Sequence, residues 1–194
     1  MRLIIILALV LMSSFLLASD WDSWVLGGIN VAGRYKEFYK DQEFKADMGL
    51  GMGFCGELLT QTQPHVSAGI GVEIMMMQKF DDEDVGGDPA FAFYPVYAVF
   101  MFHAKKSERR ITGFGQVTAG WNLGFSGNDD YGVNWDLWGA YHYGIGGGAI
   151  FFDRIRAEVR WNVYAGIGED DAGLNRPTQN VEYSTISLRV GYKF

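Results

Sequence analysis

Residues 155–168 read IRAEVRWNVYAGIG, and every second side chain along this stretch is apolar. Successive side chains of a β-strand point to opposite faces, so the pattern predicts a strand with one apolar face and one mainly polar face. An amphipathic helix places apolar residues three and four apart and does not produce this phase. The stretch is also longer than the five or six residues that are usual for a strand in a globular protein.

The same two-residue period recurs along most of the chain. In residues 44–58 one face carries Phe44, Met48, Met52 and Phe54, while the other carries charged residues and glycine. Residues 91–102 are apolar on both faces, so their phase stays open. Eight segments are predicted to be strands: 23–35, 44–59, 65–79, 90–103, 111–125, 134–151, 155–168 and 182–194. An even number suits a bacterial single-chain barrel, and a count of ten is the alternative if one hairpin is missed.

The composition of the two faces separates a membrane barrel from a soluble sandwich. The polar face is rich in glycine and carries a few charges of both signs, which suits the interior of a narrow barrel. The continuous apolar face would then contact lipid, where only a closed barrel satisfies every backbone hydrogen bond of a sheet. We therefore predict an all-β protein, a transmembrane antiparallel up-and-down β-barrel of about eight strands.

The first 19 residues read MRLIIILALVLMSSFLLAS, with one positive charge, an apolar core and small residues at the end. This order is typical of a secretory signal peptide, with cleavage after Ala18 or Ser19. A transmembrane anchor is the alternative, although the apolar run is shorter than the roughly 20 residues that a spanning helix needs. We predict a signal peptide at 1–19 and one barrel domain at 20–194.

The overall composition adds two exclusions. The formal net charge is −7, whereas domains that bind nucleic acid carry a basic stripe, so no nucleic-acid partner is expected. The single cysteine, Cys55, excludes an intrachain disulfide.

The last segment, residues 182–194, carries the most specific motif of the chain. Its apolar face ends in an aromatic residue and consists of Ile186, Leu188, Val190, Tyr192 and Phe194. This segment resembles the C-terminal signature of bacterial outer-membrane barrels, and the chain after the signal peptide resembles the small OmpA/OmpX-like eight-stranded barrels. The resemblance implies an integral bacterial outer-membrane protein with both termini in the periplasm. It also implies outer-membrane lipids and the barrel-insertion machinery as partners.

A set of polar residues is predicted to face the lumen of the barrel: Lys45, Asp47, Glu57, Glu73, Asp136, His142, Arg156, Glu158, Arg160 and Arg189. Eight strands leave an interior that side chains can fill, and buried charges need partners. The favoured hypothesis is a structural network of ion pairs. A small gated pore and a ligand pocket are the alternatives.

One predicted outer loop is strongly acidic and contains Asp81, Asp82, Glu83, Asp84 and Asp88. An EF-hand loop needs oxygen ligands at alternate positions, and Val85 stands where the third such ligand would be. A solvated loop is therefore the prediction, with no metal site and no cofactor.

Some eight-stranded barrels modify lipid A with His, Ser and a carboxylate near the outer rim. Here His65 and His103 fall at the predicted periplasmic ends, and His142 has no Ser beside it. No catalytic residue is predicted. The expected function is non-enzymatic, either in envelope integrity or in surface interaction with an unknown extracellular ligand through the acidic loops, by a monomer. A narrow channel for ions or small solutes and a lipid-modifying enzyme are the alternatives.

Overall fold

The structure, a computed structural model, describes residues 21–39, 42–76, 92–104, 110–124, 127–128, 134–170 and 179–194. The predicted signal peptide lies outside this part of the chain. The regular elements within it are all strands, and no helix there is long and apolar enough to cross a membrane. The strands are β1 Asp22–Tyr39, β2 Gln42–Met48, β3 Gly51–Gln63, β4 Val66–Met75, β5 Phe93–His103, β6 Ile111–Gly124, β7 Gly127–Asn128, β8 Asn134–Phe151, β9 Ile155–Asp170 and β10 Gln179–Lys193.

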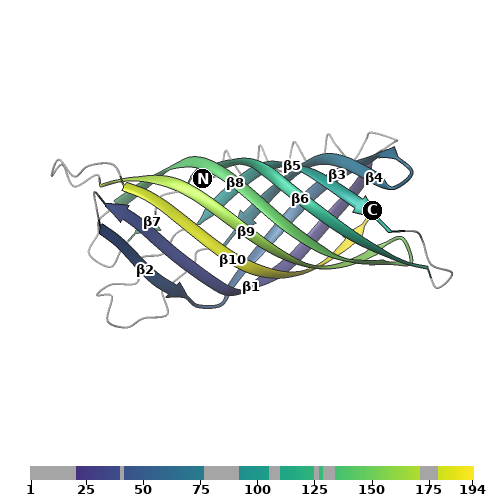
Figure 1. The fold of residues 1–194 in the computed structure, drawn as a ribbon, viewed down its shortest axis with the longest axis horizontal. Coiled ribbons are helices and arrows are strands. Elements are labelled where there is room, and N and C mark those ends of the chain that lie inside the picture. Colours follow the sequence, from purple (N-terminus) through teal and green to yellow (C-terminus); the bar gives the residue numbers. More distant parts are fainter. Residues whose placement is uncertain are drawn as a thin grey trace.

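The ten segments occupy eight strand positions around one closed barrel, and each of these positions is called here a stave (Figure 1). β2 and β3 pair with the same edge of β1, β2 over Gly33–Tyr39 and β3 over Asp22–Asn30, so together they make one stave. β6 and β7 likewise both pair with β8. Neighbours in the sheet follow chain order, and the ladder between β1 and β10 closes the cylinder. The predicted antiparallel up-and-down barrel of eight strands is confirmed.

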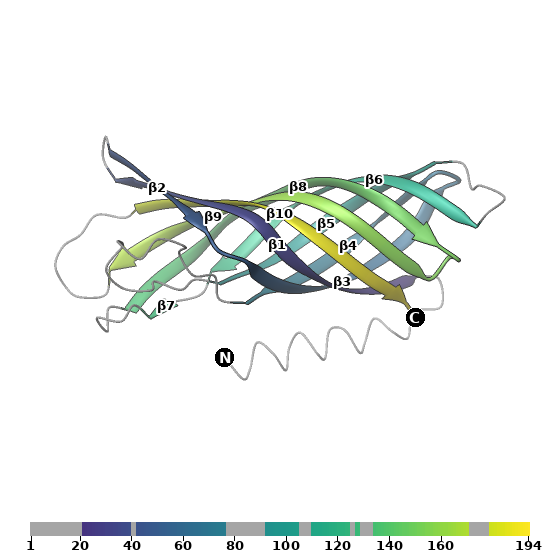
Figure 2. The ribbon, with the colours of Figure 1, turned by 90° about the horizontal axis from the view of Figure 1, so that it is seen from below.

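The two ends of the barrel differ in their connections. At the end where β1 begins and β10 stops, called here the terminal end, β8 turns into β9 through residues 152–154. Phe152 and Asp153 have φ values of 53° and 60°, and a type I′ hairpin turn requires positive φ at both central residues. At the opposite end, called here the loop end and seen at the left in Figure 2, β1 and β9 end and β2, β8 and β10 begin.

The side chains of the wall are arranged inversely to those of a soluble protein. Large apolar residues are exposed on the outer face, among them Ile29, Phe54, Ile70, Phe100, Val117, Val159, Leu188 and Val190. Arg156 and Arg160, by contrast, are completely buried inside. Charged residues are seldom fully buried in soluble proteins unless they are paired, so this arrangement suits a cylinder surrounded by lipid.

The alternation in β1, β2 and β3 changes phase part of the way along the wall. The register of β1 against β10 shifts between Asn30 and Ala32, which marks a bulge at Val31. On the neighbouring stave Gly49 and Leu50 lie between β2 and β3, outside both strands. Beyond this break the inward positions of each strand move by one residue, so Met48 is buried inside.

This break corrects two predicted lumen positions. Lys45 and Asp47 lie on the outer face and are exposed, where Lys45 pairs with Glu43 and Asp47 pairs with Arg34. The prediction treated residues 44–59 as one strand with a single phase, and a slip of one residue moves every following side chain to the other face.

Large side chains inside the barrel face glycines. A Cβ atom at Gly71 would lie 2.5 Å from the Tyr97 ring, and one at Gly33 would lie 2.7 Å from the Tyr183 hydroxyl. Neither approach is sterically possible, so these rings occupy the space that the glycines leave. The glycine-rich inner face therefore makes room for a small number of large side chains.

Candidate functional site: the charged layer of the lumen

The lumen is filled in three layers. At the terminal end lies an apolar cluster that includes Trp24, Leu26, Leu59, Val99, Met101, Phe114 and Ile150. At the loop end lies a second cluster, formed by Tyr35, Met48, Met75, Phe93, Tyr164, Val181 and Tyr183. Between them are the buried charged and polar side chains, which are called here the charged layer.

The centre of the charged layer is a ring of two arginines and two glutamates. Arg156, Glu158 and Arg160 stand on one face of β9 because every second residue of a strand points the same way. Glu57 reaches them from β3: its Oε2 lies 2.6 Å from Arg156 Nη1, and its Oε1 lies 2.7 Å from Arg160 Nη2. Glu158 completes the ring, accepting from Arg156 Nε at 2.7 Å and pairing with Arg160 Nη2 at 2.8 Å.

All four of these side chains are completely buried. Two neutral residues that the sequence analysis did not select extend the ring. Gln116 accepts from Arg156 Nη2 at 2.5 Å and donates to Glu158 at 2.9 Å. Tyr97 donates its hydroxyl hydrogen to Glu57 at 3.1 Å.

The side of the ring that faces the terminal end is covered by aromatic rings. The Arg156 guanidinium carbon lies 5.0 Å from the centre of the Phe114 ring and 5.8 Å from that of Trp24. Such cation–π contacts are stronger where water is excluded. The aromatic contacts thus close the charged layer toward the terminal end.

A second charge pair lies toward the loop end. Arg189 Nη2 is 2.7 Å from Glu73 Oε1, and the Tyr164 hydroxyl donates to the same oxygen at 3.0 Å. Ser187 connects this pair to its neighbours by donating to Asn30 and accepting from Asn162. With this pair the charged layer holds three arginines and three glutamates, so the formal charges of these six groups cancel.

His142 lies between aromatic rings in the same layer. Its ring centre is 5.2 Å from that of Tyr97 and 4.8 Å from that of Tyr164, and its Nε2 lies 3.5 Å from Thr118 Oγ1. The side chain is buried and has no serine among the partners in these contacts. At the terminal end, Ser67 Oγ and His103 Nε2 are 2.9 Å apart across β4 and β5, a pair that sequence reasoning missed.

The remaining predicted residues divide into two groups. The Asp136 side chain and the acidic residues Asp81, Asp82, Glu83, Asp84 and Asp88 lie outside what the structure describes. The apolar stripe Ile186, Leu188, Val190, Tyr192 and Phe194 is exposed on the outer face of the last stave. Within the described ranges, no group of three or more His, Cys, Asp or Glu side chains could hold a metal ion.

The residues that were missed had different signals in the sequence. Gln116 occupies an inward position of β6 and could have been found from the alternation alone. Tyr97 lies in β5, whose two faces are both apolar in sequence, so no periodicity fixed its direction. The structure shows it inward and 2% exposed.

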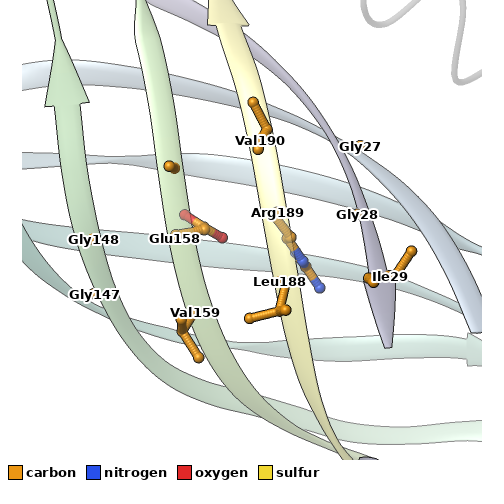
Figure 3. A pocket seen from close by; sticks show the side chains of 11 residues that line it. Gly27, Gly28, Ile29, Gly147, Gly148, Glu158, Val159, Leu188, Arg189 and Val190 are labelled. Atoms are coloured by element: carbon orange, nitrogen blue, oxygen red, sulfur yellow. The ribbon is translucent and has the colours of Figure 1, made fainter. Parts of the chain in front are cut away.

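The wall also carries an open hollow of about 530 Å³ on β1, β8, β9 and β10 (Figure 3). Gly27, Gly147 and Ala157 contribute to its lining, together with the exposed aliphatic side chains of Ile29, Val159, Leu188 and Val190. Glu158 and Arg189 also border it, but both are nearly completely buried. The hollow therefore presents aliphatic groups and suits a surface in contact with lipid.

Solved structures with the same fold are outer-membrane barrels. OprG from Pseudomonas aeruginosa matches with a TM-score of 0.57 and 10% identity over 89% of this chain and 95% of that chain. Neisserial surface protein A has a TM-score of 0.53 and 14% identity over 89% of this chain and 97% of its own. The outer membrane protein AlkL, solved in lipid bilayers, has a TM-score of 0.53 and 16% identity over 91% and 92%.

No protein-family model and no curated protein sequence matches the chain significantly. The identities to the solved structures are low, so the likeness concerns the fold alone. The expected fold of a small eight-stranded outer-membrane barrel is confirmed.

Proposed function

We propose that the protein is an integral protein of the bacterial outer membrane with a non-enzymatic role in envelope integrity or surface interaction. Its exposed apolar outer face and buried charges support this location, since the reverse arrangement is what water requires. Both termini lie in the periplasm in this proposal. The acidic loop at residues 81–88 would then face outward and be available to an extracellular partner.

The observation that carries the structural role is the closed ring of Arg156, Arg160, Glu57 and Glu158. Its four charged groups neutralise one another and have no exposed surface. An ion crossing the lumen would have to break these pairs, and removing one partner of a buried pair leaves an uncompensated charge at a cost of several kcal/mol. This arrangement therefore supports a barrel with a sealed lumen and a structural role better than it supports a channel.

Conductance in planar bilayers tests the sealed lumen. The wild-type protein should show no steady openings, whereas Glu57→Gln should produce openings or noise because Arg156 and Arg160 lose a shared partner. Glu182→Gln is the matched control, because Glu182 is partly exposed and lies on the outer face. Steady wild-type openings that Glu57→Gln alters would contradict the structural role.

The location has its own test, which is independent of conductance. Membrane fractionation should place the protein with the outer membrane, and its mobility on a gel should shift when the folded barrel is boiled. A protein that stays in the soluble fraction and whose mobility ignores boiling would contradict the proposed location.

A narrow channel is the second candidate, and one observation favours it. Asn30 Nδ2, Glu73 Oε2 and Asn162 Oδ1 are buried and have no hydrogen-bond partner within the described residues. Buried polar groups are usually satisfied, often by ordered water, so water in this part of the lumen would start a hydrated path. The conductance experiment above decides between the two candidates.

A lipid-modifying activity is the third candidate, and it depends on His142. Analysis of envelope lipids from cells with and without the protein tests it, with His142→Ala as the control variant. Equal lipid profiles in all three strains are expected. A modified lipid that is lost in His142→Ala would show an enzyme.

A further inference from the structure

Beyond the phase break, the outer faces of β1 and β2 carry several charged side chains. Val31 of β1 and Leu50 of the link between β2 and β3 are exposed apolar residues at the break, and Phe38 is a further exposed apolar residue near the end of β1. Arg34 and Lys36 on β1 and Lys45 on β2 follow on the same outer face. This charged surface, formed by Arg34, Lys36, Glu43, Lys45, Asp47 and Glu182, is called here the collar.

The collar contains two lysines in directly opposed positions. Lys36 and Lys45 are register partners in the ladder between β1 and β2, two pairs further along than Arg34 and Asp47. Like charges placed directly opposite each other in a sheet are destabilising. Neighbouring carboxylates compensate them in part, since Lys45 Nζ lies 2.7 Å from Glu43 and Lys36 Nζ lies 3.5 Å from Glu182.

These two carboxylates do not exhaust the donors of the lysines. An ammonium group has three N–H donors, and each of these pairs uses one. The Lys36 and Lys45 side chains are 30% and 54% exposed, so their remaining donors can reach a ligand outside the wall. An anion between the two ammonium groups would offset their repulsion and accept from both.

The surroundings of the collar indicate the level of the membrane surface. Glu182, the partner of Lys36, also accepts a hydrogen bond from the Tyr141 hydroxyl. The Tyr141 ring stacks on Tyr143, and Tyr143 contacts Trp161 edge-on, which makes a continuous exposed aromatic patch on β8 and β9. Tyr and Trp gather where lipid chains meet headgroups, so the contact of Tyr141 with Glu182 favours a collar near headgroup level.

We propose that Lys36 and Lys45 bind a phosphate group of a lipid in the leaflet that meets the loop end. The charge of the two opposed lysines, the apolar outer wall on their terminal-end side and the aromatic patch beside them all fit a phosphorylated lipid better than a free anion. This proposal rests on the membrane location proposed above. It adds a ligand class and a position to it.

Native mass spectrometry of the folded, detergent-solubilised full-length protein tests this binding. The probes are lipid A carrying its two phosphates and the same lipid after dephosphorylation. The double variant Lys36→Gln/Lys45→Gln should bind the phosphorylated lipid about tenfold more weakly or worse, since cations near a headgroup surface add to affinity individually. Lys193→Gln is the matched control, because Lys193 pairs with Asp22 at the opposite end of the barrel, and it should bind like the wild type.

Three results would overturn the proposal. They are equal binding by the double variant and the wild type, equal binding of the dephosphorylated lipid, and displacement of the lipid by an excess of inorganic phosphate. The gel shift on boiling shows in each case whether the variant is folded. Insertion of the same samples into phosphatidylcholine vesicles tests the location separately, so a barrel that inserts but does not discriminate the phosphates would refute the lipid site alone.

Discussion

The charged layer and the collar contain ion pairs of the same chemical kind, but the first set is buried and the second is exposed. In the charged layer the guanidinium and carboxylate groups of the ring lie within 2.8 Å of each other and have no exposed surface. In the collar, Arg34 and Asp47 lie 3.6 Å apart with side chains that are 62% and 80% exposed. The first set depends on every one of its members, whereas water and ions can replace a partner in the second.

The difference between the two sets shows how little the number of ion pairs says about stability. Two buried charges are costly to remove from water, and a buried pair is destabilised strongly when one partner is lost. An exposed pair contributes between zero and about 1 kcal/mol. Substitutions in the two regions should therefore differ in size although the chemistry that they remove is the same.

The largest effect is expected for Arg156→Met. The substitution removes one cation from Glu57 and Glu158 together and should lower the free energy of unfolding by about 3 to 5 kcal/mol. Urea unfolding in lipid vesicles, followed by tryptophan fluorescence, measures it. Arg154→Met is the matched control, since Arg154 lies two residues away in the exposed β8–β9 turn, and an equal loss in both variants would mean that burial does not decide the effect.

The next largest effect is the coupling energy between Glu73 and Arg189, the buried pair nearer the loop end. Glu73→Gln and Arg189→Met should each destabilise the barrel, but the double variant should cost about 2 kcal/mol less than the sum of the two, because it leaves neither charge alone. A double-mutant cycle of urea unfolding gives this coupling. Strict additivity would show that the pair, whose atoms lie 2.7 Å apart, is not an energetic unit.

Tyr97→Phe should have an intermediate effect. It removes only the hydroxyl that donates to Glu57 and should cost about 1.5 kcal/mol, the lower range for hydrogen bonds to charged groups. Tyr143→Phe is the control on the outer face, where Tyr143 is 41% exposed. If both variants unfold at the same urea concentration, the tyrosine does not support the ring.

The smallest effect is expected in the collar. Asp47→Asn should change the free energy of unfolding by less than about 0.5 kcal/mol, and added salt should reduce even this difference. The comparison with Glu57→Gln is the sharpest test of the strand phase. A loss at Asp47 as large as that at Glu57 would place Asp47 inside the barrel.

The sequence predicts the wall better than it predicts the contents of the lumen. Period-two alternation located all eight staves, because each strand contacts two different surroundings through its two faces. It misplaced Lys45 and Asp47, since a bulge at Val31 and the link at Gly49 shift the phase without any change in composition. It also could not assign Tyr97, whose strand is apolar on both faces.

Which lumen residues meet depends on geometry that no local pattern contains. Glu57 and Arg156 are 99 positions apart and join only because the barrel is narrow enough for side chains to cross it. The charge balance among the inward residues nevertheless predicted that they would pair. The partners of each charge, and the contribution of Gln116, came from the structure.

The seam between β1 and β10 has a consequence for the order of folding. It joins the first strand to the last, and the pair Asp22–Lys193 bridges 171 positions of sequence. Before the last strand is in place, Arg189 is missing from the interior and Glu73 has no cation. A partly synthesised chain would thus expose both an open sheet edge and an unpaired carboxylate. Contacts this distant in sequence form slowly, so closure should be a late and concerted step for which the whole chain must be kept unfolded until its C-terminus is available.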